Sequence, residues 1–254
     1  VIAWGLGVPQ HTGRFAQLRA YMRQNFLAQF DAIIAYSRSG ATQYQQAGVP
    51  KNKIFTAMNA TAARPVAPLP HRAAISAIRP ARLLYVGRLQ PRKRLDMLIK
   101  SCARLENTIQ PELWIVGDGP IKADLEQLAA AVYPKTKFWG ACYNEELAHI
   151  YRQADLFVLP GTGGLALQQA MSYGLPVIVA EGDGTQADLV NPHNGWSIPG
   201  GDEHSLYSAL QNALQYPQLI PEMAISAYQT IQNEINTEKM VEVFYQAITA
   251  VIER

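Results

Sequence analysis

The sequence contains little cysteine and no long apolar run. Its 254 residues include two cysteines, Cys102 and Cys142, which are too few for a disulfide framework and indicate a reducing compartment. Cys102 follows Leu98 at helical spacing and is best explained as a core residue. No apolar run approaches the roughly 18 residues of a membrane span, and no secretory signal is recognisable. We therefore expect a cytoplasmic protein.

Charge is also scarce. Charged residues make up 17% of the chain, below the usual share of about a quarter, and hydrophobic residues make up 48%. This composition excludes a disordered chain. The 22 basic and 20 acidic residues give a net charge of +2, which argues against a general nucleic-acid-binding protein. There is no Cys-x-x-Cys pair and the histidines show no ligand spacing, so we predict no metal site.

Short apolar runs alternate with amphipathic stretches, which is typical of a parallel sheet covered by helices on both faces. The fold class is therefore α/β, with a doubly wound, Rossmann-like parallel sheet. The expected strands are 1–4, 31–36, 53–58, 82–86, 112–116, 136–139, 155–159 and 176–180, and the expected helices include 12–29, 94–105, 121–132, 205–215 and 240–252.

The chain divides at a proline-rich stretch. Residues 60–81 carry four prolines among many alanines and few strong strand formers, and they predict a linker over 64–81. Residues 1–63 then form a partial second Rossmann-like domain, 82–235 a complete doubly wound domain, and 236–254 a C-terminal helix. Because the chain opens on Val1 in a pattern typical of mid-strand, we expect that an N-terminal segment is missing.

The expected helix 12–29 places Arg14, Arg19 and Arg23 beside four large apolar side chains. A basic amphipathic helix of this kind can lie on an anionic membrane surface, here the inner face. The alternative is a helix that docks on its own sheet and leaves its arginines in water.

The stretch from Tyr85 to Arg94 joins an expected strand to an expected helix. Gly87 ends the strand, and Arg88, Arg92, Lys93 and Arg94 follow, so three cations crowd the start of a helix. Cations are disfavoured there by some tenths of a kcal/mol each, which favours a bound anion at the carboxyl end of the strand. Arg88 can grip a phosphate bidentately and Lys93 can act as a point charge. A solvated charge run is the alternative.

Two further turns follow expected strands. Residues 159–171 pass from a strand through Gly161, Thr162, Gly163 and Gly164 into a helix, and bare amides from Gly163 to Ala166 can cradle a phosphate. Residues 116–120 form a Gly-x-Gly-Pro turn before the next helix. Tight strand–helix packing and plain turn chemistry are the alternatives for these two segments.

Taken together, these stretches resemble the nucleotide-binding half of the family 4 glycosyltransferases, which have two facing Rossmann-like domains, the GT-B fold. The similarity covers roughly residues 30–252, and its combination of motifs is more specific than any single motif. The matching segments are Ile34–Ser37, Gly48–Phe55, Asn59, Gly87–Leu89 with Lys93, Gly117–Pro120, Asp155–Pro160, Ala170–Met171 and Gly174–Ile178.

The resemblance implies a retaining, metal-independent transfer of a sugar from a nucleotide-diphosphate donor, with UDP as the preferred nucleotide, to a glycan or lipid-linked acceptor. It implies no cofactor. Residues 1–63 would be the remnant of the acceptor-binding domain. Arg88 and Lys93 would neutralise the leaving diphosphate. The remaining donor contacts implied are Gly87, Trp139, Gly140, Ala141, Gly161, Thr162, Gly163, Gly164, Leu165, Ala166 and Gln169.

Three positions depart from the family pattern, two of them in the donor loop. The family carries Glu, seven residues and a second Glu across the donor loop, where this chain has Gly161 and Gln169. Asp188 shortens a third family acid by one methylene. The alternative function is therefore a non-catalytic nucleotide-sugar-binding protein that scaffolds a partner. A sugar-nucleotide epimerase on the same plan is a weaker alternative, because no acid/base pair is evident at the donor site. The metal-binding Asp-x-Asp of the other large glycosyltransferase fold is missing from the sequence.

Overall fold

The computed structural model describes residues 1–8, 13–72, 74–76, 79–106, 109–163, 165–182 and 185–253. It divides into two compact units, which we describe separately. The first unit comprises Val1–Arg64 and Glu234–Arg254, and the second comprises Pro65–Asn233. The helix predicted near the C-terminus thus joins the first unit. The nucleotide-binding role assigned to residues 82–235 stays a prediction.

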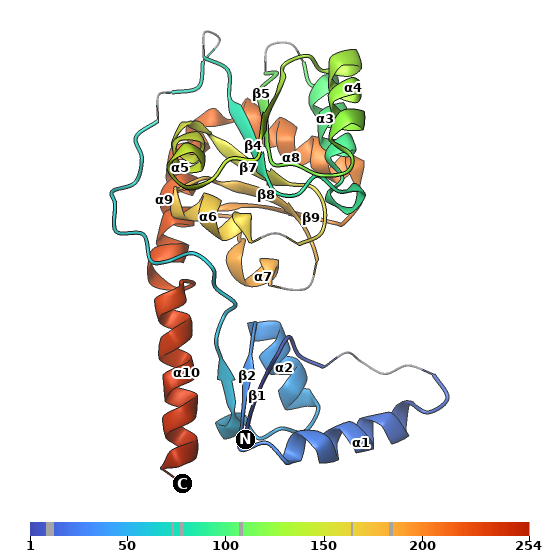
Figure 1. Ribbon diagram of the computed structural model, residues 1–254, viewed down its shortest axis with the longest axis vertical. Helices are drawn as coiled ribbons and strands as arrows, with labels where there is room; N and C mark the ends of the chain where they lie inside the picture. The colour runs from blue at the N-terminus through green and yellow to red at the C-terminus, as the bar shows by residue number, and fades with distance from the viewer. Residues whose placement is uncertain are drawn as a thin grey trace. The chain divides into compact units, whose positions relative to one another are not determined.

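The first unit is built on a three-stranded parallel sheet in the order β1-β2-β3 (Figure 1). Its elements are β1 (Ile2–Gly5), α1 (Ala16–Ala28), β2 (Ala32–Ala35), α2 (Arg38–Gln46), η1 (Lys51–Lys53), β3 (Ile54–Thr56) and α10 (Thr237–Ile252). On one face, Ile33 and Ala35 pack with Leu27 of α1 and Tyr44 of α2. On the other face, Ile34 packs with Ala247 of α10. The C-terminal helix therefore covers the second face of this sheet.

The second unit is a six-stranded parallel sheet in the order β6-β5-β4-β7-β8-β9. Figure 1 shows α3, α4 and α8 on one side of this sheet and α5, α6 and α9 on the other. The strands are β4 (Arg82–Val86), β5 (Glu112–Val116), β6 (Thr136–Gly140), β7 (Leu156–Leu159), β8 (Val177–Ala180) and β9 (Gly195–Ile198). The helices are η2 (Pro91–Lys93), α3 (Leu95–Arg104), α4 (Lys122–Val132), α5 (Asn144–Gln153), α6 (Ala166–Ser172), α7 (Gln186–Leu189), α8 (Glu203–Gln215), η3 (Pro217–Leu219) and α9 (Ile220–Asn233).

The predicted α/β fold with a doubly wound parallel sheet and a partial second sheet is confirmed. Every residue of the central strands β7 and β8 is buried, as expected for strands covered on both faces. Strand β9 is not among the strands expected from the sequence, because Gly195–Ile198 is short and lies between turn residues. Gly195 is required there, because a Cβ would collide with the carbonyl oxygen of Val177 on β8.

The proline-rich segment predicted as a linker is attached to the second unit from residue 65 onward. The Arg72 guanidinium donates hydrogen bonds to the carbonyl oxygens of Ala154 (2.6 Å), Tyr173 (2.7 Å) and Tyr151 (3.2 Å). Arg79 forms a bidentate ion pair with the buried Asp155. Backbone carbonyls and one carboxylate therefore help to hold this segment against the amino-terminal side of β7.

Candidate functional site

The sheet order places a topological switch point between β4 and β7. The chain runs outward from β4 to β5 and β6, and then returns to β7 on the other side of β4. Ligands of open parallel sheets bind outside the carboxyl ends of the strands at such a point. A cavity of about 780 Å³ opens beside this point, at the carboxyl ends of β4, β5 and β6, and is lined by the residues around the ends of these three strands.

Backbone hydrogen bonds fasten the loops after β4 and β5 to each other. The amide of Gly87 donates to the carbonyl of Val116 at 3.0 Å, and the amide of Leu89 donates to that of Asp118 at 2.8 Å. A Cβ at Gly117 would collide with the carbonyl oxygen of Gly87, and a Cβ at Gly119 with that of Leu89. The Gly-x-Gly spacing is thus explained by the close approach of two backbones, beyond the plain turn chemistry weighed from the sequence.

Three of the predicted site residues, Gly87, Arg88 and Ala141, line this cavity. Arg88 is exposed, so its guanidinium is available to an anion in solution. The lining also includes residues that sequence reasoning left without a site role, among them Asp118 and Tyr143. Their position directly after strands β5 and β6 is the signal that could have identified them.

Lys93 lies in a second contact, between η2 and the glycine-rich loop after β7. Its ammonium donates hydrogen bonds to the carbonyl oxygens of Thr162, at 2.8 Å, and of Gly163. The amide of Thr162 donates in turn to the carbonyl of Arg92 at 3.2 Å. Lys93 is only 6% exposed, and this burial, with a smaller effect of the Arg92 cation, lowers the pKa of its ammonium.

The geometry of this contact corrects the predicted start of the helix at Arg94. Pro91–Lys93 form a 3-10 turn, Arg94 is left-handed with φ of 54°, and α3 begins at Leu95. The cations therefore lie on a turn before the helix. Lys93 caps carbonyl oxygens of the facing loop, and Arg94 pairs with Asp96 at 3.6 Å.

The close packing around Gly161 explains why this position carries no side chain, which is the first departure from the family pattern. A Cβ at this position would collide with the carbonyl oxygen of Arg92 and lie 2.6 Å from the carbonyl carbon of Lys93. The loop therefore packs so closely on η2 that no side chain fits, and a glutamate could not be accommodated without moving one of the two segments.

The other predicted donor contacts are placed as follows. Trp139 packs edge-on against Trp114 at 5.5 Å between ring centroids and under the Lys137 ammonium. The carbonyl of Gly140 accepts from the amide of Gly117 at 2.7 Å. Leu165 and Gln169 are exposed, and Ala166 begins α6. Gly164 lies outside the described residues. The donor-binding roles of all these residues stay predictions.

Two features are absent from the part of the chain that the structure describes. No group of three or more His, Cys, Asp or Glu side chains in that part of the chain is arranged to hold a metal ion. Within the same residues, no helix combines the length and the apolar character needed to cross a membrane.

We expect Gly161→Ala to separate the glycine-rich loop from η2 and to lower the free energy of unfolding by about 1–3 kcal/mol, as overpacking does. Urea unfolding measures this change. Gly200→Ala is the matched control, because a Cβ there would meet only the carbonyl oxygen of Glu181, at 3.3 Å. Equal stability of the two variants would contradict the packing described for Gly161.

Comparisons with known proteins identify the family and the fold. A family model described as "Glycosyl transferases group 1" matches residues 80–216, which is more than half of the chain. A GDP-mannose-dependent alpha-mannosyltransferase of Mycobacterium tuberculosis is 37% identical over 139 residues, which cover 53% of this chain and 34% of that protein. An amylovoran biosynthesis glycosyltransferase of Erwinia amylovora is 27% identical over 187 residues, which cover 69% and 45%.

The fold comparison extends over the whole chain. The crystal structure of Anabaena HepE in complex with UDP matches with a TM-score of 0.72 at 18% identity, and covers 100% of this chain and 72% of that one. The chain spans between about a third and a half of the two curated relatives. From the family match and the sheet topology, the chain belongs to the group 1 glycosyltransferases, family 4, which have the GT-B fold.

Proposed function

We propose that the second unit binds a nucleotide-diphosphate sugar, and that the protein is a retaining, metal-independent glycosyltransferase acting on a glycan or lipid-linked acceptor. The observation that carries this proposal is the cavity of about 780 Å³ at the carboxyl ends of β4, β5 and β6, with the exposed Arg88 in its wall. Its size suits a nucleotide, and its position is where parallel sheets bind such ligands.

The position of each residue in the cavity suggests which part of the donor it would contact. The loop that contains Ala141 would meet the base, and Arg88 would face the diphosphate. In the transfer, the bond between the anomeric carbon and the diphosphate breaks, a bond to the acceptor oxygen forms, and the leaving phosphate takes the acceptor proton. No protein nucleophile is required, so catalysis rests on positioning and on cations that stabilise the developing negative charge.

Lys93 can serve this reaction from its buried position. An ammonium has three N–H donors, and two of them are engaged by the carbonyl oxygens of Thr162 and Gly163. The third donor is left for a phosphate oxygen of the donor. In that arrangement Lys93 would hold the glycine-rich loop and the leaving group together.

UDP is the nucleotide we propose first. HepE was crystallised with UDP, whereas the mannosyltransferase relative is named for GDP-mannose. Titration of the chain with UDP, GDP and ADP in metal-free buffer tests this choice. If the chain binds GDP more tightly than UDP, the choice of UDP is wrong. If a folded sample binds none of the three nucleotides, the proposed donor site is contradicted.

Arg88→Ala is expected to weaken binding of the preferred nucleoside diphosphate by about 1.5–3 kcal/mol, the range for a hydrogen bond to a charged group. Binding of the matching nucleoside should change far less, because it lacks phosphate. Isothermal titration calorimetry measures both. Lys100→Ala, an exposed cation on α3, is the control and should change neither. An equal loss of both ligands in Arg88→Ala would contradict the diphosphate role.

The alternative is a nucleotide-sugar-binding protein that no longer transfers sugar, and Gln169 is the observation that favours it. Gln169 replaces a family acid by a neutral amide on the exposed side of α6.

If the site is active, we expect slow release of nucleoside diphosphate when the chain is incubated with UDP-glucose or GDP-mannose. Binding without release, with release gained in Gln169→Glu, would instead support the non-catalytic function. Substitution of Gly161 by Glu is not informative, because the loop has no room for it.

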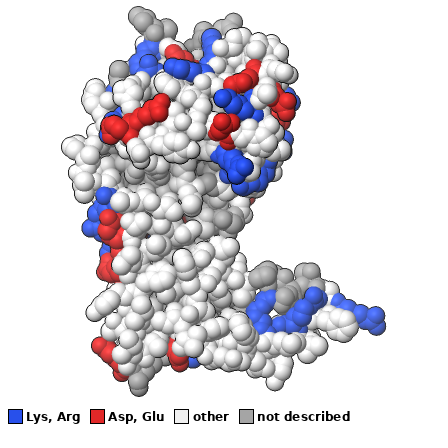
Figure 2. Space-filling view, in the orientation of Figure 1, with Lys and Arg blue, Asp and Glu red and all other residues white. Residues whose placement is uncertain are grey.

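We also propose that α1 makes a peripheral contact with an anionic membrane. Figure 2 shows Lys and Arg side chains, and no acidic ones, gathered over α1, and residues 1–30 contain no Asp or Glu. Leu18, Met22 and Phe26 of this helix are more than half exposed.

In a flotation experiment with phosphatidylglycerol vesicles, the protein should move to the lipid fraction, and Met22→Glu should abolish this binding. Val241→Glu, at an exposed apolar position of α10, is the control. Equal flotation of both variants would contradict the contact.

A further inference from the structure

A further cavity of the second unit, of about 610 Å³, lies at the edge of the sheet opposite the donor cavity. Its lining includes Asp155, which directly precedes β7, whereas the donor cavity lies at the carboxyl ends of the strands. One wall is formed by residues of the segment 69–75, and the other by η3 and the first turns of α9. None of these residues has a role in the donor site.

Most of the wall is aliphatic. Leu69 and Ile75 come from the segment before β4, and Ile220, Ala224 and Ile225 come from α9. A cavity of several hundred Å³ is typical of sites for small ligands. The transfer of apolar surface from water into such a cavity is favourable in proportion to the area buried. The cavity therefore suits a hydrocarbon chain.

Arg72 brings a cation to this apolar cavity. Its guanidinium is half-buried and donates to the carbonyl oxygens of Ala154, Tyr151 and Tyr173. A longer bond of 3.4 Å joins its Nη1 to the carbonyl oxygen of Pro70. These bonds use four of the five N–H donors of the guanidinium, and the fifth, on Nη1, meets no acceptor among the residues that the structure describes. An anionic ligand can bind at this donor.

The carboxylate in the lining belongs to Asp155, and it is already engaged. Its two oxygens accept from the guanidinium of Arg79 at 2.9 and 3.1 Å, and one of them also accepts from the amide of Arg82 at 2.8 Å. The remaining polar side chains of the lining, His71 and Gln218, are exposed. With the histidine neutral, the lining and the paired Arg79 together keep one positive charge in excess.

Burial lowers the pKa of the Arg72 guanidinium to about 10, while the nearby Asp155 raises this pKa and Arg79 lowers it. A pKa of this size still keeps the group charged at neutral pH. A half-buried charge that carries no ion pair is costly, and the carboxylate of a ligand would remove this cost. One cation in excess is matched by an anion of single charge.

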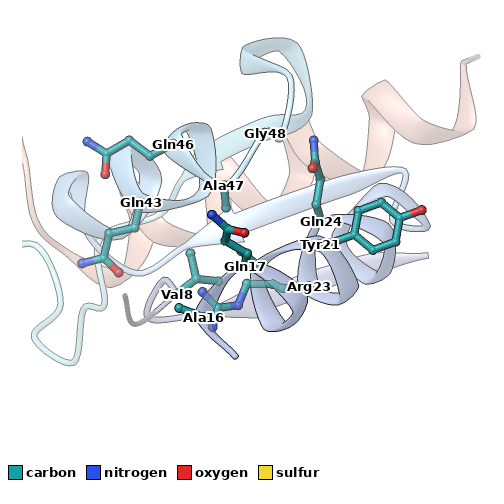
Figure 3. A pocket seen from close by; sticks show the side chains of 11 residues that line it. Val8, Ala16, Gln17, Tyr21, Arg23, Gln24, Gln43, Gln46, Ala47 and Gly48 are labelled. Atoms are coloured by element: carbon teal, nitrogen blue, oxygen red, sulfur yellow. The ribbon is translucent and has the colours of Figure 1, made fainter. Parts of the chain in front are cut away.

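The groove between α1 and α2 of the first unit, of about 690 Å³, has a different lining. Figure 3 shows glutamine side chains from both helices along it, namely Gln17, Gln24, Gln43 and Gln46. A hydrocarbon chain placed there would take amide groups out of water, which costs free energy unless each amide is hydrogen-bonded. The cavity of the second unit is therefore the better match for an apolar ligand.

We propose that this cavity binds a fatty acid or a similar single-chain carboxylate, with the acyl chain between the segment 69–75 and α9 and the carboxylate on Nη1 of Arg72. The inference goes beyond the proposed transferase function, because such a ligand is neither the donor nor the acceptor and binds at the opposite edge of the sheet. A bound chain would contact both walls at once, and would hold the segment 69–75 against α9.

Isothermal titration calorimetry of the whole chain with octanoate, decanoate and dodecanoate, each below its micelle concentration, tests the proposal. We expect one saturable site for dodecanoate, and a loss of about tenfold in affinity for each two methylenes removed, because each buried methylene contributes about equally. Dodecyltrimethylammonium has the same chain length and the opposite charge, and it should bind about tenfold more weakly or not at all. Dodecanoate should also raise the melting temperature, since it binds the folded state.

Two variants test the two halves of the site. Arg72→Gln should weaken dodecanoate binding by about tenfold or more, the scale of a hydrogen bond to a charged group, and leave binding of dodecan-1-ol unchanged. Arg104→Gln, at an exposed arginine of α3 outside the lining, is its control. Ala74→Trp fills the cavity from its exposed rim and should abolish binding of both ligands. Ala130→Trp, at an exposed position of α4, is the matched control.

Ala74→Trp keeps the hydrogen bonds of Arg72, so it decides the outcome even if Arg72→Gln does not fold. Failure of the folded protein to bind dodecanoate overturns the proposal, as does equal binding of dodecyltrimethylammonium. Binding that survives in folded Ala74→Trp also overturns it, and its loss in Met22→Glu would then place the acyl chain on α1. Affinity for nucleoside diphosphate should be unchanged in Ala74→Trp. Failure of nucleotide binding alone would therefore contradict the proposed function and leave this site intact.

Discussion

The parallel pairing of β4 with β7 is the interaction on which the second unit depends. Leu83 lies opposite Leu156 and Leu84 opposite Phe157, although more than 70 residues separate the partners. This pairing creates the switch point, because the chain leaves the two strands in opposite directions across the sheet. It also brings the cationic turn after β4 against the glycine-rich loop after β7, so that Lys93 reaches Thr162 and Gly163.

Close backbone approach is the constraint that these loops share. Gly117 and Gly119 admit the backbone of residues 87–89, and Gly161 admits that of Arg92. Each contact replaces a side chain by main-chain packing. The absence of a glutamate at position 161 is then a consequence of how the loop packs on η2. From the sequence pattern alone, the same position shows only that the family's acidic side chain is missing.

The first unit is built from segments near both ends of the chain. Its three strands come from the first 56 residues, but one face of the sheet is covered by α10 from the last 18. The segment between Pro65 and β4 is held in part by the half-buried hydrogen bonds of Arg72 and by the ion pair of Arg79 with Asp155. Paired polar groups therefore contribute to holding this segment, in which strong strand formers are few.

The sequence by itself determined the α/β class, eight of the strands and the loops that form the candidate site. These features are local: apolar periodicity sets the strands, and glycine and proline set the turns that end them. Only the tertiary structure decided that Lys93 caps the carbonyl oxygens of Thr162 and Gly163, that Gly161 packs on Arg92, that α10 covers the small sheet and that four glutamines share a groove. The physical reason is that these contacts join residues far apart in the chain, and their geometry follows from strand order and helix packing, which no short stretch of sequence encodes.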